Sequence, residues 1–66
     1  MKGTVKFFDD VRNYGFIEPD GDEEDHFVHR SSIQNDYFLE EGDRVEFESI
    51  LEDKGYQALN VRKIED

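Results

Sequence analysis

Short extended runs separated by turn signals make up this sequence, and no stretch shows the i, i+3, i+4, i+7 apolar spacing of an amphipathic helix. The runs cover residues 2–8, 12–18, 26–29, 44–51 and 56–64. Residues 19–21 and 52–55 are turn sequences, because proline presets φ and glycine accepts a positive φ. Five short strands in 66 residues predict an all-β fold, a small closed or nearly closed barrel without open sheet edges.

The chain length allows one domain, spanning residues 1–66, of marginal stability. The absence of cysteine excludes a disulfide framework and a thiolate metal site, and we expect neither a metal nor a cofactor. Apolar runs of two or three residues are too short for a transmembrane helix or a secretory signal. We therefore expect a cytoplasmic monomer with no membrane partner.

Alternation along the runs predicts which side chains are buried. The expected core consists of Val5, Ile17, Val28, Ile33, Val45, Phe47, Leu59 and Val61. Alternation fails after Phe47, because the polar Ser49 stands where an apolar side chain is due, and a β-bulge in this strand would account for it. Residues 30–36 predict a short helical turn that Ser31 caps and from which Ile33 packs under the barrel.

The charge balance is the feature that least suits a nucleic-acid ligand. The chain has 18 acidic against 8 basic residues, a net charge of -10, whereas phosphate contacts usually supply much of the affinity for nucleic acid. Residues 18–66 hold 16 of the acidic and 5 of the basic residues, so only two of the acidic residues lie in residues 1–17. Nine aromatic residues and a single proline argue against the disorder that such a composition can produce.

Aromatic side chains occupy alternate positions in the second and third runs. Alternation places on one face Arg12, Tyr14, Phe16, Phe27 and His29. Ile17 and Val28 point the other way, and if they are buried, the rings face solvent. The inverse orientation would expose both aliphatic side chains and bury an arginine and a histidine. Exposed rings on a sheet suit nucleobases, since each stacked base contributes about 1–3 kcal/mol, enough to offset a poor electrostatic term.

These segments resemble the bacterial cold shock proteins and the cold-shock domain of Y-box proteins. The resemblance is carried by an opening strand at residues 3–8, two ribonucleoprotein motifs at residues 13–17 and 27–29, and Gly55, Asn60 and Val61 near the end. It covers essentially the whole chain. It implies a five-stranded antiparallel β-barrel of the oligonucleotide-binding type (OB-fold). It also implies an RNA chaperone that binds single-stranded RNA and DNA and melts or prevents RNA secondary structure.

The resemblance also assigns roles to individual residues. It gives the family's stacking positions to Phe7, Tyr14, Phe16, Phe27 and His29. Lys6 and Arg12 take its basic positions, and Phe38, or alternatively Tyr37, takes the aromatic position of the long loop. Arg30 stands where the family often has phenylalanine, and its guanidinium can both stack on a base and meet a phosphate.

The sequence departs from the family pattern at several places. Phe7 replaces a tryptophan, Asn13 replaces a glycine, which implies possible backbone strain, and the loop at residues 35–39 is shorter than usual. The acidic body resembles the surfaces of proteins from salt-loving organisms. At high salt, counterion release contributes little to the affinity, whereas the stacking contribution to the affinity falls less. We therefore expect a halophilic source.

Four other classes fit less well. An RNA recognition motif needs two helices and has its two motifs in the opposite order. A metal site at His26 and His29 is disfavoured because a spacing of three places the rings on opposite faces of a strand, and we expect His26 to be solvated or half-buried. The acidic residues 22–25 could bind hydrated cations weakly but lack the EF-hand pattern. An enzyme is disfavoured because no nucleophile elbow surrounds Ser31 and Ser32.

The runner-up function is a protein-interaction barrel whose aromatic side binds another protein.

Overall fold

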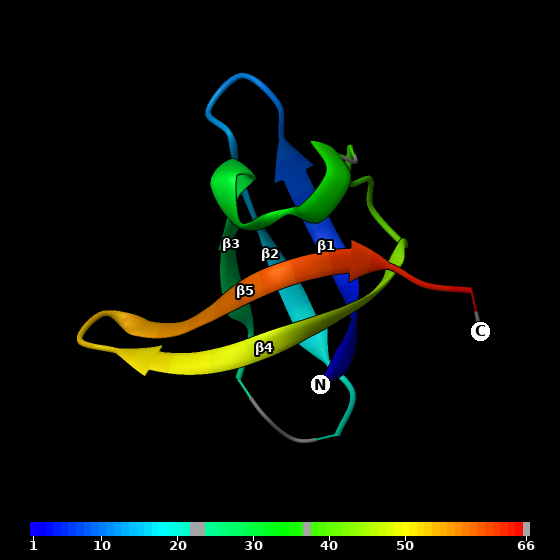
Figure 1. Ribbon diagram of the computed structural model, residues 1–66. Helices are drawn as coiled ribbons and strands as arrows, with labels where there is room; N and C mark the ends of the chain where they lie inside the picture. The colour runs from blue at the N-terminus through cyan, green and yellow to red at the C-terminus, as the bar shows by residue number, and fades with distance from the viewer. Residues whose placement is uncertain (22–23, 37, 66) are drawn as a thin grey trace.

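Five strands form the fold in the computed structural model, which describes residues 1–21, 24–36 and 38–65. They are β1 (Lys2–Asp9), β2 (Tyr14–Pro19), β3 (His26–His29), β4 (Arg44–Glu52) and β5 (Gly55–Lys63). Two single 3-10 turns, η1 (Arg30–Ser32) and η2 (Gln34–Asp36), follow β3, where a short helical turn is expected. The strands close in the order β1-β2-β3-β5-β4, so the predicted all-β barrel is confirmed (Figure 1).

Barrel closure depends on a contact between strands far apart in the chain. The contacts β1–β2, β2–β3, β1–β4 and β4–β5 are antiparallel, whereas β3 and β5 run parallel and pair at Phe27 and Gln57. Between η1 and η2, the buried Ile33 forms a bridge with Val61 of β5, which attaches the turns to the barrel. In the described part of the chain, no helix is long and apolar enough to cross a membrane.

The core follows the predicted alternation with one error. The buried hydrophobic side chains are Val5, Ile17, Val28, Ile33, Leu39, Val45, Phe47, Ala58 and Val61. The prediction of Leu59 as a core residue is wrong, because Ala58 is buried instead and Leu59 is only partly buried. Glu46 pairs with Arg62 and Glu48 with Leu59, so β5 has one residue more than β4 between these two pairs.

This β5 bulge changes which side chains point inward. Asn60 lies within it and adopts a left-handed backbone with φ of 52°, a conformation that asparagine tolerates better than most residues. Ala58 and Val61 are therefore both buried although they lie three positions apart. The irregularity lies opposite Phe47, close to the predicted place, but the extra residue belongs to β5 rather than to β4.

His26 is fully buried, so the prediction of a solvated or half-buried side chain is wrong. Nδ1 donates to the carbonyl oxygen of Glu24 at 2.8 Å, and Nε2 lies 2.6 Å from the hydroxyl of Ser49. The ring stacks on Tyr56 with centroids 5.0 Å apart and lies 5.2 Å from the ring of Phe47. The polar residue that interrupts the alternation of β4 is thus the partner of a buried imidazole.

Ser49→Ala should lower the free energy of unfolding by about 1–3 kcal/mol, because it leaves one nitrogen of the buried His26 ring without a partner. Urea denaturation followed by circular dichroism would measure the change. Ser32→Ala, the same substitution in a turn, is the control and should change stability by less than about 0.5 kcal/mol. Equal unfolding midpoints for the two variants would contradict a structural role of the His26–Ser49 pair.

Candidate nucleic-acid interface

Four aromatic rings form one continuous surface on the outside of β1, β2 and β3. We call this set the aromatic face; it consists of Phe7, Tyr14, Phe16 and Phe27. Each ring contacts at least two of the others, with centroid distances of 5.7–6.3 Å. Ile17 and Val28 have no exposed surface, so the rings point outward as predicted. The arrangement offers adjacent apolar planes at the surface, which is the geometry that base stacking requires.

A bulge in β1 brings Phe7 onto the aromatic face. The register between β1 and β2 shifts between Val5 and Phe7, where β1 has one extra residue, Lys6. Strict alternation after the buried Val5 would direct Phe7 into the core. Instead Phe7 is 42% exposed, and Phe8 packs against the core. The β1 bulge therefore exchanges the roles of two consecutive phenylalanines.

Gly15 allows the rings of β1 and β2 to meet. A Cβ atom at Gly15 would lie 2.2 Å from the carbonyl oxygen of Phe7 and 2.8 Å from the ring of Phe8. A hydrogen atom is the only substituent that this space accepts, so the two strands can approach only with glycine here. Because Gly15 lies between Tyr14 and Phe16, the close approach occurs where the aromatic face is built.

Arg12 does not share a strand face with the rings, so that part of the prediction is wrong. β2 begins only at Tyr14, and Arg12 lies in the turn between β1 and β2. The Asp9 carboxylate accepts the backbone N–H groups of Val11 and Arg12 at 2.9 and 3.1 Å and thereby shapes this turn. Asn13 completes the turn with a φ of 62°, so the position where the family usually has glycine uses the left-handed backbone. The role of Arg12 as a phosphate contact stays a prediction.

His29 lies exposed at the end of β3 and caps the turn η1. Its Nδ1 accepts the backbone N–H of Ser31 at 3.1 Å, and the Ser31 hydroxyl lies 3.0 Å from the same nitrogen. The prediction that Ser31 caps this turn is therefore wrong, since the cap is the histidine. The contact fixes the imidazole ring next to Tyr14, with which His29 pairs across β2 and β3.

Arg30 and Phe38 come together at the edge of the interface. The guanidinium carbon of Arg30 lies 4.5 Å from the centre of the Phe38 ring, a cation–π contact, and Phe38 remains 63% exposed. Tyr37, the alternative for the loop aromatic, lies outside the described residues. The pair extends the possible stacking surface by one ring and one cation.

Carboxylates already neutralise part of the positive charge beside the aromatic face. Lys6 Nζ lies 2.9 Å from Asp25 Oδ2, and this hydrogen bond raises the pKa of Lys6. Arg12 forms a looser ion pair with Asp9 at 3.9 Å. A phosphate would therefore have to compete with these carboxylates, which limits the electrostatic contribution to binding.

Sequence reasoning missed a cavity of 510 Å³ that adjoins the aromatic face. Phe16 and Phe27 form one part of its lining, and the remainder consists of Glu24, Asp25, Lys54, Gly55, Tyr56 and Gln57. The last four residues come from the β4–β5 hairpin, which reaches β3 through the parallel closing contact. No sequence signal places residues 54–57 beside residues 24–27, because that neighbourhood depends on the closure of the barrel.

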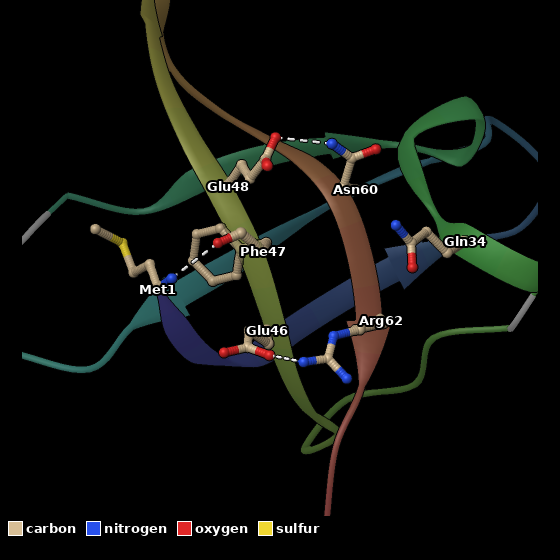
Figure 2. Close-up of a pocket in the computed structure, with 7 residues that line it drawn as sticks. All are labelled: Met1, Gln34, Glu46, Phe47, Glu48, Asn60 and Arg62. Atoms are coloured by element: carbon tan, nitrogen blue, oxygen red, sulfur yellow. Dashed lines mark hydrogen bonds and ion pairs between the residues drawn. The ribbon is translucent and has the colours of Figure 1, made fainter.

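A different hollow, of 290 Å³, lies over β4 and β5 (Figure 2). Four of its polar side chains pair with one another: Asn60 donates to Glu48 at 2.7 Å, and Arg62 forms an ion pair with Glu46. The Phe47 ring beneath is only 3% exposed, so this hollow offers no stacking plane among its lining residues.

No metal site emerges in the described part of the chain, where no group of three or more His, Cys, Asp or Glu side chains could hold an ion. His26 is buried and His29 exposed, so the two rings lie on opposite sides of β3 as their spacing predicts. Asp22 and Glu23 of the acidic loop lie outside the described residues.

Three comparisons with known proteins agree with this geometry. The family profile described as 'Cold-shock' DNA-binding domain matches residues 1–64. The cold shock-like protein CspA of Stigmatella aurantiaca is 53% identical over 64 residues, covering 94% of each chain. Cold shock protein CspA of Staphylococcus aureus is 51% identical over 65 residues, covering 96% of this chain and 97% of that protein.

A solved structure has the same fold. The Drosophila Unr structure titled CSD456 superposes on 97% of this chain with a TM-score of 0.78 and 20% sequence identity. This chain spans 26% of the length of that protein. At this level of identity the match supports the fold alone.

Proposed function

We propose, since this chain belongs to the 'Cold-shock' DNA-binding domain family, that it binds single-stranded RNA and DNA by stacking unpaired bases on the aromatic face. The observation that carries the proposal is the set of four rings, each in contact with at least two of the others, outside a core that contains Ile17 and Val28. Bases in a duplex are already stacked and paired, so the rings would select unpaired strands. A protein that holds bases unpaired would act as an RNA chaperone.

Stacking rather than charge is the main source of affinity in this proposal. The chain has a net charge of -10, and both Lys6 and Arg12 have carboxylate partners. At about 1–3 kcal/mol for each stacked base, three or four rings supply the affinity that the phosphates cannot. His29 and Phe38 would extend the row of rings, and Lys6, Arg12 and Arg30 would contact phosphates.

Binding of a fluorescein-labelled oligo-uridine, with the matching oligo-deoxythymidine and a duplex as comparisons, tests this function. We expect both single strands to bind and the duplex to bind far more weakly. The three basic side chains at the interface allow a slope no steeper than about −2 in log K against log salt for a single strand, because carboxylates already pair with Lys6 and Arg12. Quenching of tyrosine fluorescence gives a second signal, because the chain has no tryptophan.

The same salt series should also report on folding. With 18 acidic residues, the repulsion between carboxylates weakens as potassium chloride is added, so the unfolding temperature should rise toward molar salt. Equal folding and equal binding in dilute buffer and in molar salt would contradict the proposed adaptation to salt. Failure of every single strand to bind, at any salt concentration, would contradict the proposed function and favour a protein partner for the aromatic face.

A further inference from the structure

One edge of β4 is unpaired beyond Phe47. β4 lies between β5 and β1 in the barrel, but its register with β1 covers only residues 44–46 and is followed by two hydrogen bonds between Phe47 and Met1. β5 continues beside β4 as far as the pair of Glu52 and Gly55. Among the described strands, residues 48–52 of β4 therefore pair with β5 alone, and the β4–β5 hairpin projects beyond the rest of the barrel (Figure 1).

Alternation along β4 identifies the free backbone groups of this edge. The Phe47 N–H donates to the Met1 carbonyl oxygen at 2.8 Å, and the Phe47 carbonyl oxygen accepts the Met1 amino group at 2.9 Å, so both groups of Phe47 point toward β1. Successive residues of an antiparallel ladder direct these groups to opposite sides, and the extra residue of the bulge belongs to β5. The N–H and C=O groups of Ser49 and Leu51 therefore point to the same side as those of Phe47, beyond the last residue that pairs with β1. Leu51 is 69% exposed, so the edge is open to solvent there.

The outer face of this edge carries one apolar side chain between two carboxylates. The Ser49 side chain points into the barrel, so Glu48, Ile50 and Glu52 point outward. Both glutamates are exposed, Ile50 is partly buried, and Glu48 uses one carboxylate oxygen for Asn60. A strand added to the edge would place its own side chains opposite these three, where opposite charges stabilise the pairing and like charges destabilise it.

The charges decide which kind of partner the edge fits. Two copies of β4 that paired antiparallel about Ile50 would place Glu48 of each copy opposite Glu52 of the other, in two chains that each have a net charge of -10. The phosphates of a nucleic acid would meet the same carboxylates. An extended peptide supplies backbone donors and acceptors for Ser49 and Leu51, and basic side chains on it would pair with the two glutamates.

We propose that residues 48–52 of β4 bind an extended basic segment of a protein partner, which adds a strand to the barrel. The backbone groups of Ser49 and Leu51 supply the hydrogen bonds. Glu48, Ile50 and Glu52 select a segment in which an aliphatic residue stands between two basic residues at alternate positions. None of these residues belongs to the aromatic face, so the inference does not depend on the proposed nucleic-acid binding.

Titration of isotope-labelled protein with the peptide Thr-Lys-Thr-Val-Thr-Lys-Thr, followed by amide NMR, tests the edge. The amide resonances of Ser49 and Leu51 should shift most and their hydrogen exchange should slow, because these N–H groups gain acceptors. The same peptide with glutamate in place of lysine should bind about fivefold or more weakly, because two favourable cross-strand pairs become unfavourable. Potassium chloride should weaken binding of the lysine peptide.

Leu51→Pro provides the sharpest variant. Proline removes the outward N–H but no hydrogen bond between β4 and β5, a change that an edge strand tolerates. Its affinity for the lysine peptide should fall about fivefold or more. Leu51→Thr is the matched control, since it also loses the leucine side chain but keeps the N–H, and it should bind as the wild type does. Circular dichroism of both variants checks that the barrel is intact.

Three results would overturn the inference. Equal affinity of the two folded Leu51 variants for the lysine peptide would mean that the peptide binds through charge alone. Amide shifts concentrated away from β4 in the wild-type protein would have the same meaning, and this measurement decides the question if Leu51→Pro does not fold. Sedimentation that shows a dimer of the protein alone, stronger at high salt and absent in Leu51→Pro, would assign the edge to a second copy of this chain.

Discussion

Gly15→Ala should largely unfold the domain. The added Cβ would lie 2.2 Å from the carbonyl oxygen of Phe7 and 2.9 Å from the Cα atom of Phe8, both of them backbone atoms that no side-chain rotation can move away. β1 and β2 would have to separate, at a cost of about 3 kcal/mol or more. A domain of this size rarely has more than about 3–5 kcal/mol of stability from its core.

Near-ultraviolet circular dichroism and urea denaturation would show the loss of fold. Gly42→Ala is the matched control, since it adds the same methyl group where no atom lies within 4 Å. Its backbone has a φ of +93°, so the control carries a strain of about 1–3 kcal/mol but no collision. If Gly15→Ala were at least as stable as Gly42→Ala, the close approach of β1 and β2 would not be required for the fold.

Phe27→Ala should mainly weaken binding and Val28→Ala should weaken only stability, although the residues are neighbours in β3. Phe27 contacts Tyr14 and Phe16 on the aromatic face, whereas Val28 has no exposed surface. Loss of the Phe27 ring should weaken binding to oligo-uridine by about 1–3 kcal/mol and stability by about 1 kcal/mol. Val28→Ala should cost about 2 kcal/mol of stability and leave the affinity of the folded protein unchanged.

Fluorescence anisotropy and thermal denaturation of the two variants would give both quantities. The pair is informative because each variant serves as the control of the other on the same strand. A core-sized stability loss for Phe27→Ala without a loss of affinity would mean that the ring supports the fold and does not bind bases. Loss of affinity in folded Val28→Ala would mean that the interface depends on packing below the rings.

The sequence predicts the orientation of the rings correctly because β2 and β3 are regular strands at the positions of the aromatic residues. Ile17 and Val28 alternate with Phe16 and Phe27 without interruption, so a period of two suffices there. The errors fall where the chain leaves a regular strand. Arg12 lies in a turn rather than on β2, and Leu59 precedes the left-handed Asn60 of the β5 bulge.

The remaining errors concern partners that lie far apart in the sequence. Alternation places His26 inward, two positions before the buried Val28, but its partners Ser49 and Tyr56 are brought to it from β4 and β5 by barrel closure. The cavity beside the aromatic face depends on the same closure. Alternation along the sequence concerns one strand at a time and does not predict which strands come together. The partners of His26 and the cavity could therefore be found only from the three-dimensional structure.

The two bulges determine which changes in chain length the protein can accept. Removing Lys6 or Asn60 would remove the extra residue and keep Phe7 outward and Ala58 and Val61 inward, whereas removing one residue from a regular stretch of a strand would turn the side chains that follow to the opposite face. Insertions in the turns at residues 10–13 and 53–54 shift no side chain from one face to the other. Variation in length among related domains should therefore concentrate in those turns and at the two bulges, whereas the regular stretches of β2 and β3 keep their length even where the residues themselves change.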